Sequence, residues 1–161
     1  FKIDLKTLYP DSYHQLGGSL KKIKQSLEYA KEIGLWVEIV TLIVPGFNDS
    51  IGEIRAAASY LCGVSPEIPW HLTAFHPDYK RTAPHRTTTE SIMRLAEVAQ
   101  EEGMLFVYAG NTIGGTDQFQ NTQCPNCQSL LITRRGFSTR SNRITKGRCP
   151  DCQTSIPGIW S

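Results

Sequence analysis

The 161-residue sequence contains no apolar run that approaches the length of a membrane-spanning helix, and no signal peptide opens it. These absences argue against a membrane partner and against a secreted protein held together by disulfides. The hydrophobic share of 40% and the charged share of 20% are typical of globular proteins. We therefore expect a cytoplasmic protein.

Several motifs of nucleotide and acyl chemistry are also missing. The sequence has neither a P-loop nor a G-x-G-x-x-G fingerprint, so nucleotide binding of those types is unsupported. No Ser-His-Asp arrangement is legible, and Ser50 is explained as a helix N-cap. The first residue is Phe1 rather than Met, within an apolar-rich strand pattern, which leads us to expect a piece of a longer protein.

Cysteine is scarce, yet four of the five cysteines form the strongest motif of the sequence. Cys124 and Cys127 make one C-P-x-C pair, and Cys149 and Cys152 make a second. Two such pairs supply the four thiolates of a closed tetrahedral site, so we predict structural zinc in a zinc-ribbon-like module. The alternatives are two disulfides, or iron in a rubredoxin-like, electron-carrying centre. The fifth cysteine, Cys62, is interpreted as a small buried hydrophobe.

Charge is unevenly distributed along the chain, although the formal net charge is only +2. From residue 121 onward there are six basic residues and one acidic residue, against eleven basic and fourteen acidic before it. This excess makes the C-terminal segment a candidate surface for an anionic partner such as RNA, although a solvated basic hairpin is the commoner case. The basic side chains are Arg134, Arg135, Arg140, Arg143, Lys146 and Arg148.

Hydrophobic periodicity predicts alternating strands and helices before the cysteine motif. Strands are expected at 1–8, 36–44, 70–75 and 105–109. The second of them, WVEIVTLIV, is nearly continuous in apolar residues, which is typical of a strand covered on both faces. Helices are expected to begin at Ser19, at the capping box of Ser50 with Glu53 and at that of Thr87 with Glu90, and to end at Gly34, Gly63 and Gly103.

This alternation predicts an α/β fold with a parallel sheet. Three βα units and one further strand fall short of a closed eight-fold barrel, which takes about 250 residues. Either the sheet is open or the missing units precede Phe1. The Gly-rich segment 111–122 is interpreted as a linker, and we place the domain boundary between 1–118 and 119–161.

Ligands of parallel βα folds collect at the carboxyl ends of the strands. Asp4 and Lys6 project to one face there, where they either bracket a zwitterion or an ion or form a strand-end ion pair. His76 is the preferred ligand-contacting histidine, whereas His71 is interpreted as a satisfied core or lumen histidine. Further polar residues at strand ends or in the following loop are Thr41, Asp78, Tyr79, Lys80, His85 and Asn111.

Three segments at these strand ends resemble radical SAM enzymes of the pyruvate formate-lyase-activating type: Asp4-Leu5-Lys6, IVPGFND at 43–49 and Phe75-His76-Pro77. The closer resemblance is to the AmmeMemoRadiSam system radical SAM enzymes. It is carried, in the same order, by WHLTAFHPDYK, LFVYAGN, the two C-P-x-C pairs and the ending IPGIW. It covers essentially all 161 residues.

The resemblance implies a partial (β/α) barrel over residues 1–118 that binds S-adenosylmethionine beside a [4Fe-4S] cluster. Reductive cleavage of that cofactor, with flavodoxin or ferredoxin as the reductant, would give a 5'-deoxyadenosyl radical. This radical would abstract hydrogen from a protein or other macromolecular substrate. Matched motif to motif, Asp4 and Lys6 would lie in the S-adenosylmethionine and cation region, and His76 would face the same cofactor.

The sequence departs from this family in one respect, because the cluster-binding C-x3-C-x2-C loop is absent. Without three thiolates for the cluster there is no electron source for cleavage of S-adenosylmethionine. We therefore expect this chain alone to be inactive and the intact protein to carry the cluster loop upstream. The rival hypothesis is a non-catalytic zinc-ribbon protein whose basic hairpin binds nucleic acid or a protein partner.

Overall fold

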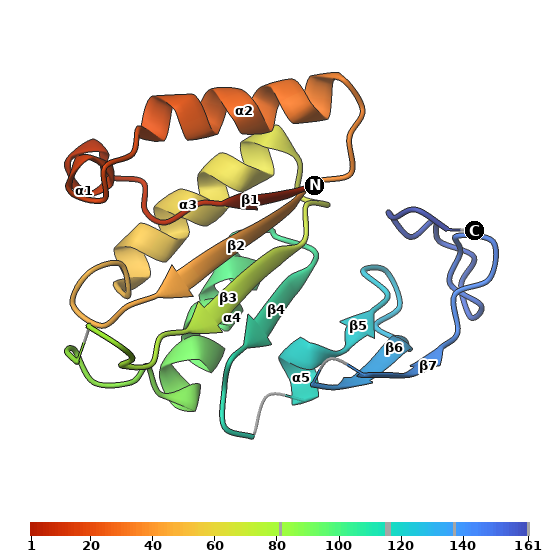
Figure 1. Cartoon of the computed structure of the whole chain (residues 1–161). Coiled ribbons are helices and arrows are strands. Elements are labelled where there is room, and N and C mark those ends of the chain that lie inside the picture. Colours follow the sequence, from red (N-terminus) through yellow and green to blue (C-terminus); the bar gives the residue numbers. More distant parts are fainter. Residues whose placement is uncertain (81, 115–116, 137, 161) are drawn as a thin grey trace.

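The computed structural model describes residues 1–80, 82–114, 117–136 and 138–160. Within these ranges, the first part of the chain forms a parallel sheet whose strands lie side by side in sequence order (Figure 1). The strands are β1 (Lys2–Asp4), β2 (Glu38–Ile43), β3 (Trp70–Ala74) and β4 (Val107–Gly110). The predicted α/β fold with a parallel sheet is confirmed, and these four strands form an open sheet rather than a closed barrel.

The two faces of this sheet differ in burial. Helices α2 (Leu20–Glu32), α3 (Ile51–Val64) and α4 (Thr89–Glu101) contribute buried residues to one core cluster, together with one face of the strands. Along β2, fully buried positions alternate with half-buried ones, so the prediction of a strand covered on both faces is wrong. The other face, here called the open face, carries Asp4, Val40, His71 and Tyr108 in one row of the strand register.

The first strand is shorter than predicted because the chain turns away from the sheet after Asp4. Pro10 begins helix α1 (Pro10–Gln15), in a segment where the sequence analysis expected only a loop. Proline is favoured in the first turn of a helix because the amide it lacks would have no helical partner there. Tyr13 of this short helix is buried and packs into the core, which fixes the residues that follow β1.

The first predicted capping box is half right and the second is wrong. Ser50 caps α3 by accepting a hydrogen bond from the backbone N–H of Glu53, 3.2 Å away. The Glu53 carboxylate, however, is buried and accepts a hydrogen bond from the hydroxyl of Thr7, and burial raises its pKa. Helix α4 is capped by Thr88 rather than Thr87, whose buried hydroxyl instead donates to the Ile43 carbonyl at 2.6 Å.

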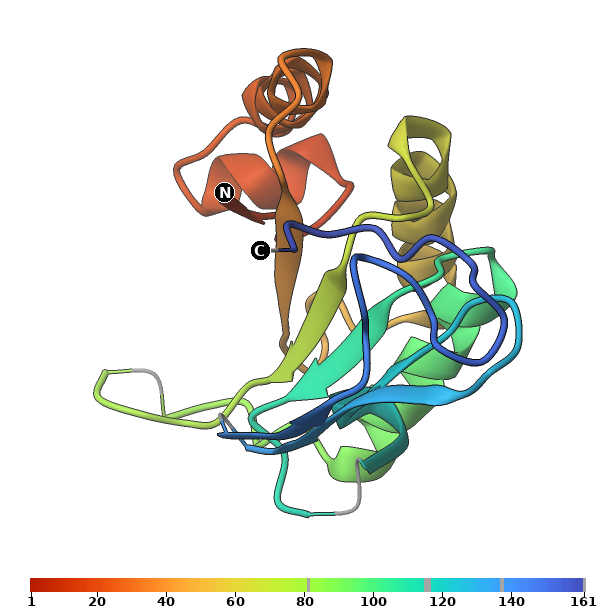
Figure 2. The ribbon, with the colours of Figure 1, turned by 90° about the vertical axis from the view of Figure 1, so that its right-hand side faces the viewer.

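The C-terminal part of the chain forms a separate antiparallel sheet beside the β4 end of the parallel sheet (Figures 1 and 2). It consists of β5 (Thr122–Gln123), β6 (Leu130–Arg135) and β7 (Ser138–Asn142). The segment expected as a linker contains helix α5 (Asp117–Gln120), whose Phe119 is fully buried in the core of the α/β part. The predicted domain boundary therefore runs through a packed segment.

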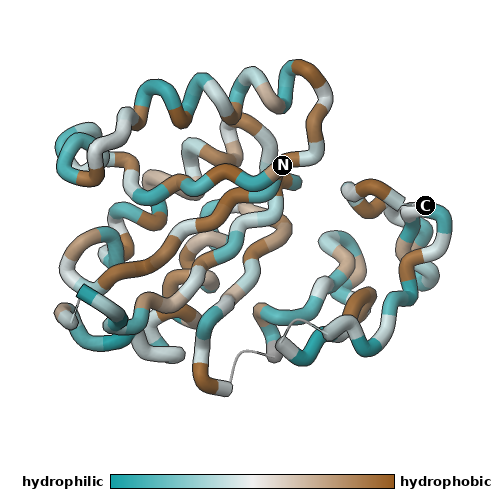
Figure 3. Tube along the Cα trace, in the orientation of Figure 1, coloured by the Kyte–Doolittle hydropathy of each residue, from teal (hydrophilic) through white to brown (hydrophobic). Residues whose placement is uncertain are grey.

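The parallel sheet and the C-terminal sheet also differ in hydropathy (Figure 3). The strand β2 is coloured hydrophobic along most of its length, whereas β7 is hydrophilic and exposed throughout. The core of the C-terminal part is small: Cys124, Leu131, Ile132, Cys149 and Ile156. Within the described ranges, none of the helices combines the length and apolar character that crossing a bilayer requires.

Candidate functional site

The predicted cysteine quartet comes together in space. The sulfur atoms of Cys124, Cys127, Cys149 and Cys152 all lie within 4.8 Å of one another. The separations are 3.5 Å between Cys124 and Cys152 and 3.7 Å between Cys127 and Cys149. A disulfide requires about 2.05 Å, so the disulfide alternative is wrong. Tetrahedral thiolates with metal–sulfur bonds of about 2.3 Å are separated by about 3.8 Å, so the donor set fits one metal ion.

The two C-P-x-C pairs are local repeats of one turn. In each, the residue after the second cysteine has a left-handed backbone, with φ of 62° at both Gln128 and Gln153. The backbone N–H of each glutamine donates to the backbone carbonyl of the first cysteine of its pair, at 2.9 Å in both turns. This geometry directs both sulfurs of a pair to the same side, and the two turns then face each other across the centre.

The thiols of the quartet differ in their acidity. A hydrogen bond with Thr154 lowers the pKa of Cys152 to about 6, and one with Ser129 lowers the pKa of Cys127. Burial raises the pKa of Cys124 to about 11. Because metals bind the thiolate form, metal binding releases the protons that the thiols still carry.

The predicted pair at the carboxyl end of β1 forms an ion pair. Lys6 Nζ lies 2.8 Å from Asp4 Oδ2, and both side chains are partly exposed on the open face. The second carboxylate oxygen, Oδ1 of Asp4, is buried and has no hydrogen-bond partner among the described residues. A buried carboxylate oxygen without a donor is an acceptor available to a cation or an ammonium group.

Two buried side chains hold this pair in position. The Tyr13 hydroxyl donates to the Asp4 carbonyl at 3.1 Å and accepts from the Lys6 amide at 2.8 Å. The Asn48 amide group donates to the carbonyls of Lys6 and Leu42, at 2.7 and 2.9 Å. Asn48 therefore ties the carboxyl ends of β1 and β2 together. The IVPGFND segment was noticed in the sequence, but this bridging role was not.

The other predicted strand-end residues are less closely assembled. His76 follows β3 at the same edge of the sheet, is exposed, and makes no described contact with Asp4 or Lys6. Thr41 does not reach the edge, because its hydroxyl is buried between the Leu5 carbonyl and the Trp70 indole. The remaining candidates are exposed: Asp78, Tyr79, Lys80, His85 and Asn111.

The open face also carries a polar network that the sequence analysis missed. His71 Nε2 lies 2.9 Å from a carboxylate oxygen of Glu38, and this hydrogen bond lowers the pKa of Glu38. The His71 ring stacks on the Tyr108 ring, with ring centroids 5.1 Å apart. The Arg134 guanidinium lies over the Tyr108 ring, 5.4 Å from its centroid. His71 is thus hydrogen-bonded through Nε2, and its partners Glu38 and Tyr108 come from the two neighbouring strands.

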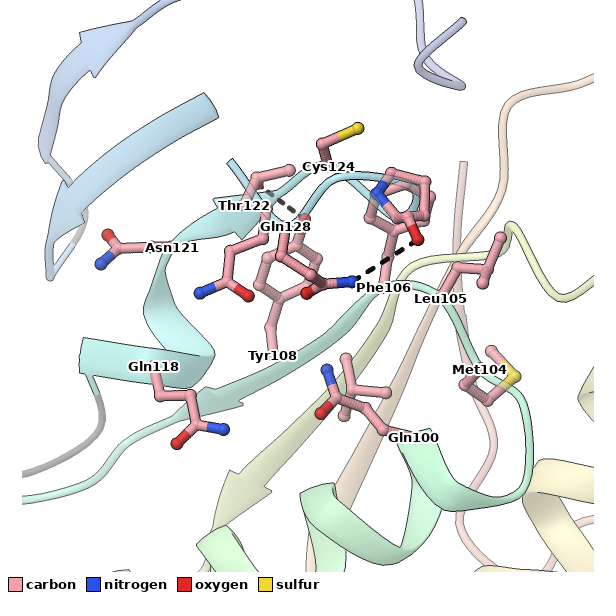
Figure 4. Close-up of a pocket in the computed structure, with 13 residues that line it drawn as sticks. Gln100, Met104, Leu105, Phe106, Tyr108, Gln118, Asn121, Thr122, Cys124 and Gln128 are labelled. Carbon is pink, nitrogen blue, oxygen red and sulfur yellow. Dashed lines mark hydrogen bonds between the residues drawn. The ribbon is translucent and has the colours of Figure 1, made fainter. Parts of the chain in front are cut away.

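Two cavities lie where the C-terminal part meets the parallel sheet. One, of about 260 Å³, is bordered by the start of β4 and the first cysteine turn. Figure 4 shows that Gln100, Gln118, Asn121 and Gln128 surround it, and that Tyr108 is hydrogen-bonded to Thr122 at its wall. The other cavity, of about 570 Å³, contains the Glu38–His71–Tyr108 network.

Comparison with known proteins identifies similarities of sequence and of structure. The chain is 36% identical over 141 residues to an uncharacterized protein of Methanocaldococcus jannaschii, MJ0808, covering 86% of this chain and 42% of that protein. The chain therefore spans less than half the length of this relative. No protein-family model matches the chain.

The second similarity is structural. A crystal structure of a domain of pyruvate-formate lyase-activating enzyme from Bacteroides vulgatus matches with a TM-score of 0.52 at 14% identity. The match covers 70% of this chain and 66% of that chain. The chain thus shares the fold of that domain. The finer resemblance to AmmeMemoRadiSam system enzymes stays a prediction.

Proposed function

We propose that this chain is the S-adenosylmethionine-binding C-terminal part of a radical SAM enzyme related to the glycyl-radical-enzyme activases. The observation that carries the proposal is the buried Oδ1 of Asp4 beside Lys6, which no described residue hydrogen-bonds, at the strand edge of a fold shared with an activating-enzyme domain. Strand edges of this kind are the usual ligand sites of parallel βα folds.

The described residues fit the amino-acid end of S-adenosylmethionine. Its ammonium group needs an acceptor, which Asp4 Oδ1 offers, and its carboxylate needs a cation, which Lys6 offers. His76, exposed after β3, is proposed as a third contact. When bound next to a reduced cluster, S-adenosylmethionine supplies a radical that abstracts hydrogen from a macromolecular substrate.

The cysteines of this chain do not fit a [4Fe-4S] cluster that must cleave S-adenosylmethionine. Four of them close around one metal, which leaves no open position, and Cys62 is distant in sequence from all of them. We therefore assign the cluster ligands, and the docking of a reductant such as flavodoxin or ferredoxin, to the longer protein. After treatment with iron, sulfide and a reductant, these 161 residues should release no 5'-deoxyadenosine.

Replacing Asp4 with Asn should weaken binding of S-adenosylmethionine by about tenfold or more. The neutral amide removes the negative charge that favours the ammonium group and that pairs with Lys6, and a charge-assisted hydrogen bond contributes about 1.5–3 kcal/mol. Equilibrium dialysis with labelled cofactor would measure the change. Asp11→Asn, on the exposed first turn of α1, is the matched control and should have no effect. Equal affinity of both variants would contradict the proposal.

The rival function, nucleic-acid binding by the basic hairpin, is supported by a smaller set of side chains than the sequence suggested. Arg135, Arg140 and Lys146 are exposed and have no described partner. Arg134 instead points back to Tyr108 and donates to the Gln120 carbonyl at 3.0 Å. Salt-sensitive RNA binding that is lost on Arg135→Ala with Arg140→Ala, without cofactor binding, would favour the rival.

A further inference from the structure

The 570 Å³ cavity is lined by none of the three residues proposed to bind the cofactor, Asp4, Lys6 and His76. Most of its sheet residues precede the strands or lie in their first halves, as do Trp36, Glu38 and His71, whereas Ala109 and Gly110 extend the lining along β4. Its opposite wall comes from the C-terminal part, including Arg134 and Trp160. The volume falls in the range of about 300–1,000 Å³ that is common for small-molecule sites.

Trp160 is held in this wall by a cradle of two glycines. A Cβ atom at Gly158 would lie 2.6 Å from the indole ring, and one at Gly147 would lie 2.9 Å from it. The indole N–H donates to the Ile156 carbonyl at 2.7 Å, which fixes the ring orientation. The side chain is nevertheless 37% exposed, so part of the indole remains available beside the cavity. An immobilised, partly exposed indole is a stacking platform for a flat ring.

The polar groups of the cavity leave one acceptor available. The Glu38 carboxylate accepts from the Trp36 indole at 3.1 Å and pairs with His71 Nε2 at 2.9 Å. When Glu38 is ionised, it holds the Nε2 proton in place, so Nδ1 of the neutral ring is an acceptor. Among the described residues, Nδ1 of His71 has no partner. A ligand that fills this cavity must therefore bring an N–H or O–H donor.

The charge of the cavity indicates a ligand with no net charge. Glu38 contributes one negative charge and Arg134 one positive charge, and the other lining side chains are aromatic, aliphatic or uncharged. The Arg134 guanidinium is already engaged by Thr122, at 2.9 Å, and by the Tyr108 ring. A free cation that would select a phosphate is thus missing from the described lining, which leaves stacking and edge hydrogen bonds as the recognition elements.

We propose that this cavity binds a planar nitrogen heterocycle of the nucleobase type, stacked on Trp160 and donating an N–H to Nδ1 of His71. The same chemistry is offered by a free nucleoside and by an unstacked base of single-stranded RNA. The site is independent of the proposed cofactor edge, because Asp4 and Lys6 do not line it.

Titration of the protein with guanosine, followed by tryptophan fluorescence and calorimetry, tests this site. Trp160→Ala should weaken binding about tenfold or more, the loss expected on removal of one stacking platform. Trp160→Phe should recover part of the affinity, because it restores a smaller ring. Gly147→Ala should weaken binding as well, since the added methyl group displaces the indole. Tyr29→Ala, which removes an exposed aromatic ring on α2, should change nothing.

Two further measurements distinguish a free nucleoside from an RNA base as the ligand, and distinguish this cavity from the proposed cofactor site. A short single-stranded RNA tests the polymeric source, and Asp4→Asn should leave guanosine affinity unchanged. Binding of either probe that depends on Trp160 supports the proposal. RNA binding that is unaffected by Trp160→Ala, or no binding of either probe at about millimolar concentration, would overturn it. Metal content measured in every variant shows that the C-terminal part is still folded.

Discussion

Replacing Cys149 with Ser is expected to abolish tight metal binding and to unfold the chain from the first cysteine turn onward. The core of this part contains few side chains, and two of its fully buried members are the candidate metal ligands Cys124 and Cys149. A core this small cannot offset the conformational entropy of ordering the segment. Structural zinc sites supply about 10–16 kcal/mol of apparent binding energy, which is the folding energy of such modules. Elemental analysis and amide hydrogen exchange would measure both losses.

Cys62→Ser is the matched control for this prediction. Cys62 lies outside the quartet, where its thiol contacts the Glu102 carbonyl at 3.5 Å, so metal content and exchange should stay unchanged. The same elemental analysis identifies the metal, since the proposed zinc gives a colourless protein and a rubredoxin-like iron centre gives a coloured one. If Cys149→Ser kept full protection in β6, the metal would not be what holds this sheet together.

Loss of the metal should also change the solvent exposure of residues on the parallel sheet, although the hydrophobic core of that sheet is separate from the core of the C-terminal part. Arg134 of β6 lies over Tyr108, whose hydroxyl is hydrogen-bonded to Thr122 of β5 at 2.8 Å. Unfolding of the C-terminal sheet would therefore expose the His71 and Tyr108 rings on the open face. We therefore expect a metal bound by the four cysteines to act at a distance from the carboxyl edge, by holding a wall of the neighbouring cavity.

The fold was predictable where the signal is local. Three-residue and four-residue spacings placed α2, α3 and α4, and β-branched runs placed β2 and β3, because each pattern reflects burial against one core. Helix α1 was missed because Pro10 was interpreted as a break in a strand, although proline also begins helices. The second face of β2 was misjudged because its half-buried aliphatic residues, such as Val40, look identical to core residues in sequence.

The candidate sites were likewise predictable only where the signal is local in sequence. The cysteine quartet was predictable because each C-P-x-C turn brings two sulfurs together by itself, so that only two turns need to meet. The Glu38–His71–Tyr108 network was not, because its members lie on three different strands and meet only through the register of the sheet. Glu38, a charged residue inside an apolar strand, was the one signal in the sequence that could have indicated it.

Asn48→Ala should destabilise the protein by about 3 kcal/mol or more and weaken the Asp4 site with it. The Asn48 side chain donates hydrogen bonds to the Lys6 and Leu42 carbonyls and accepts one from the Val44 backbone N–H at 2.7 Å. Asn48 is only 2% exposed, so water cannot reach these backbone groups to replace the hydrogen bonds that truncation removes. Each unsatisfied buried group costs about 1–3 kcal/mol. Chemical denaturation would give the change in the free energy of unfolding.

The neighbouring Asp49 provides the control for this last prediction. Its carboxylate accepts from the Gly46 amide at 2.9 Å in the same turn, but it is exposed, so water can replace it. Asp49→Ala should therefore cost less than about 1 kcal/mol. Because Asn48 bridges β1 to β2, its loss should also free the end of β1 and lower cofactor affinity in the folded fraction. Equal destabilisation by the two variants would mean that the turn, and not the bridge between strands, positions Asp4 and Lys6.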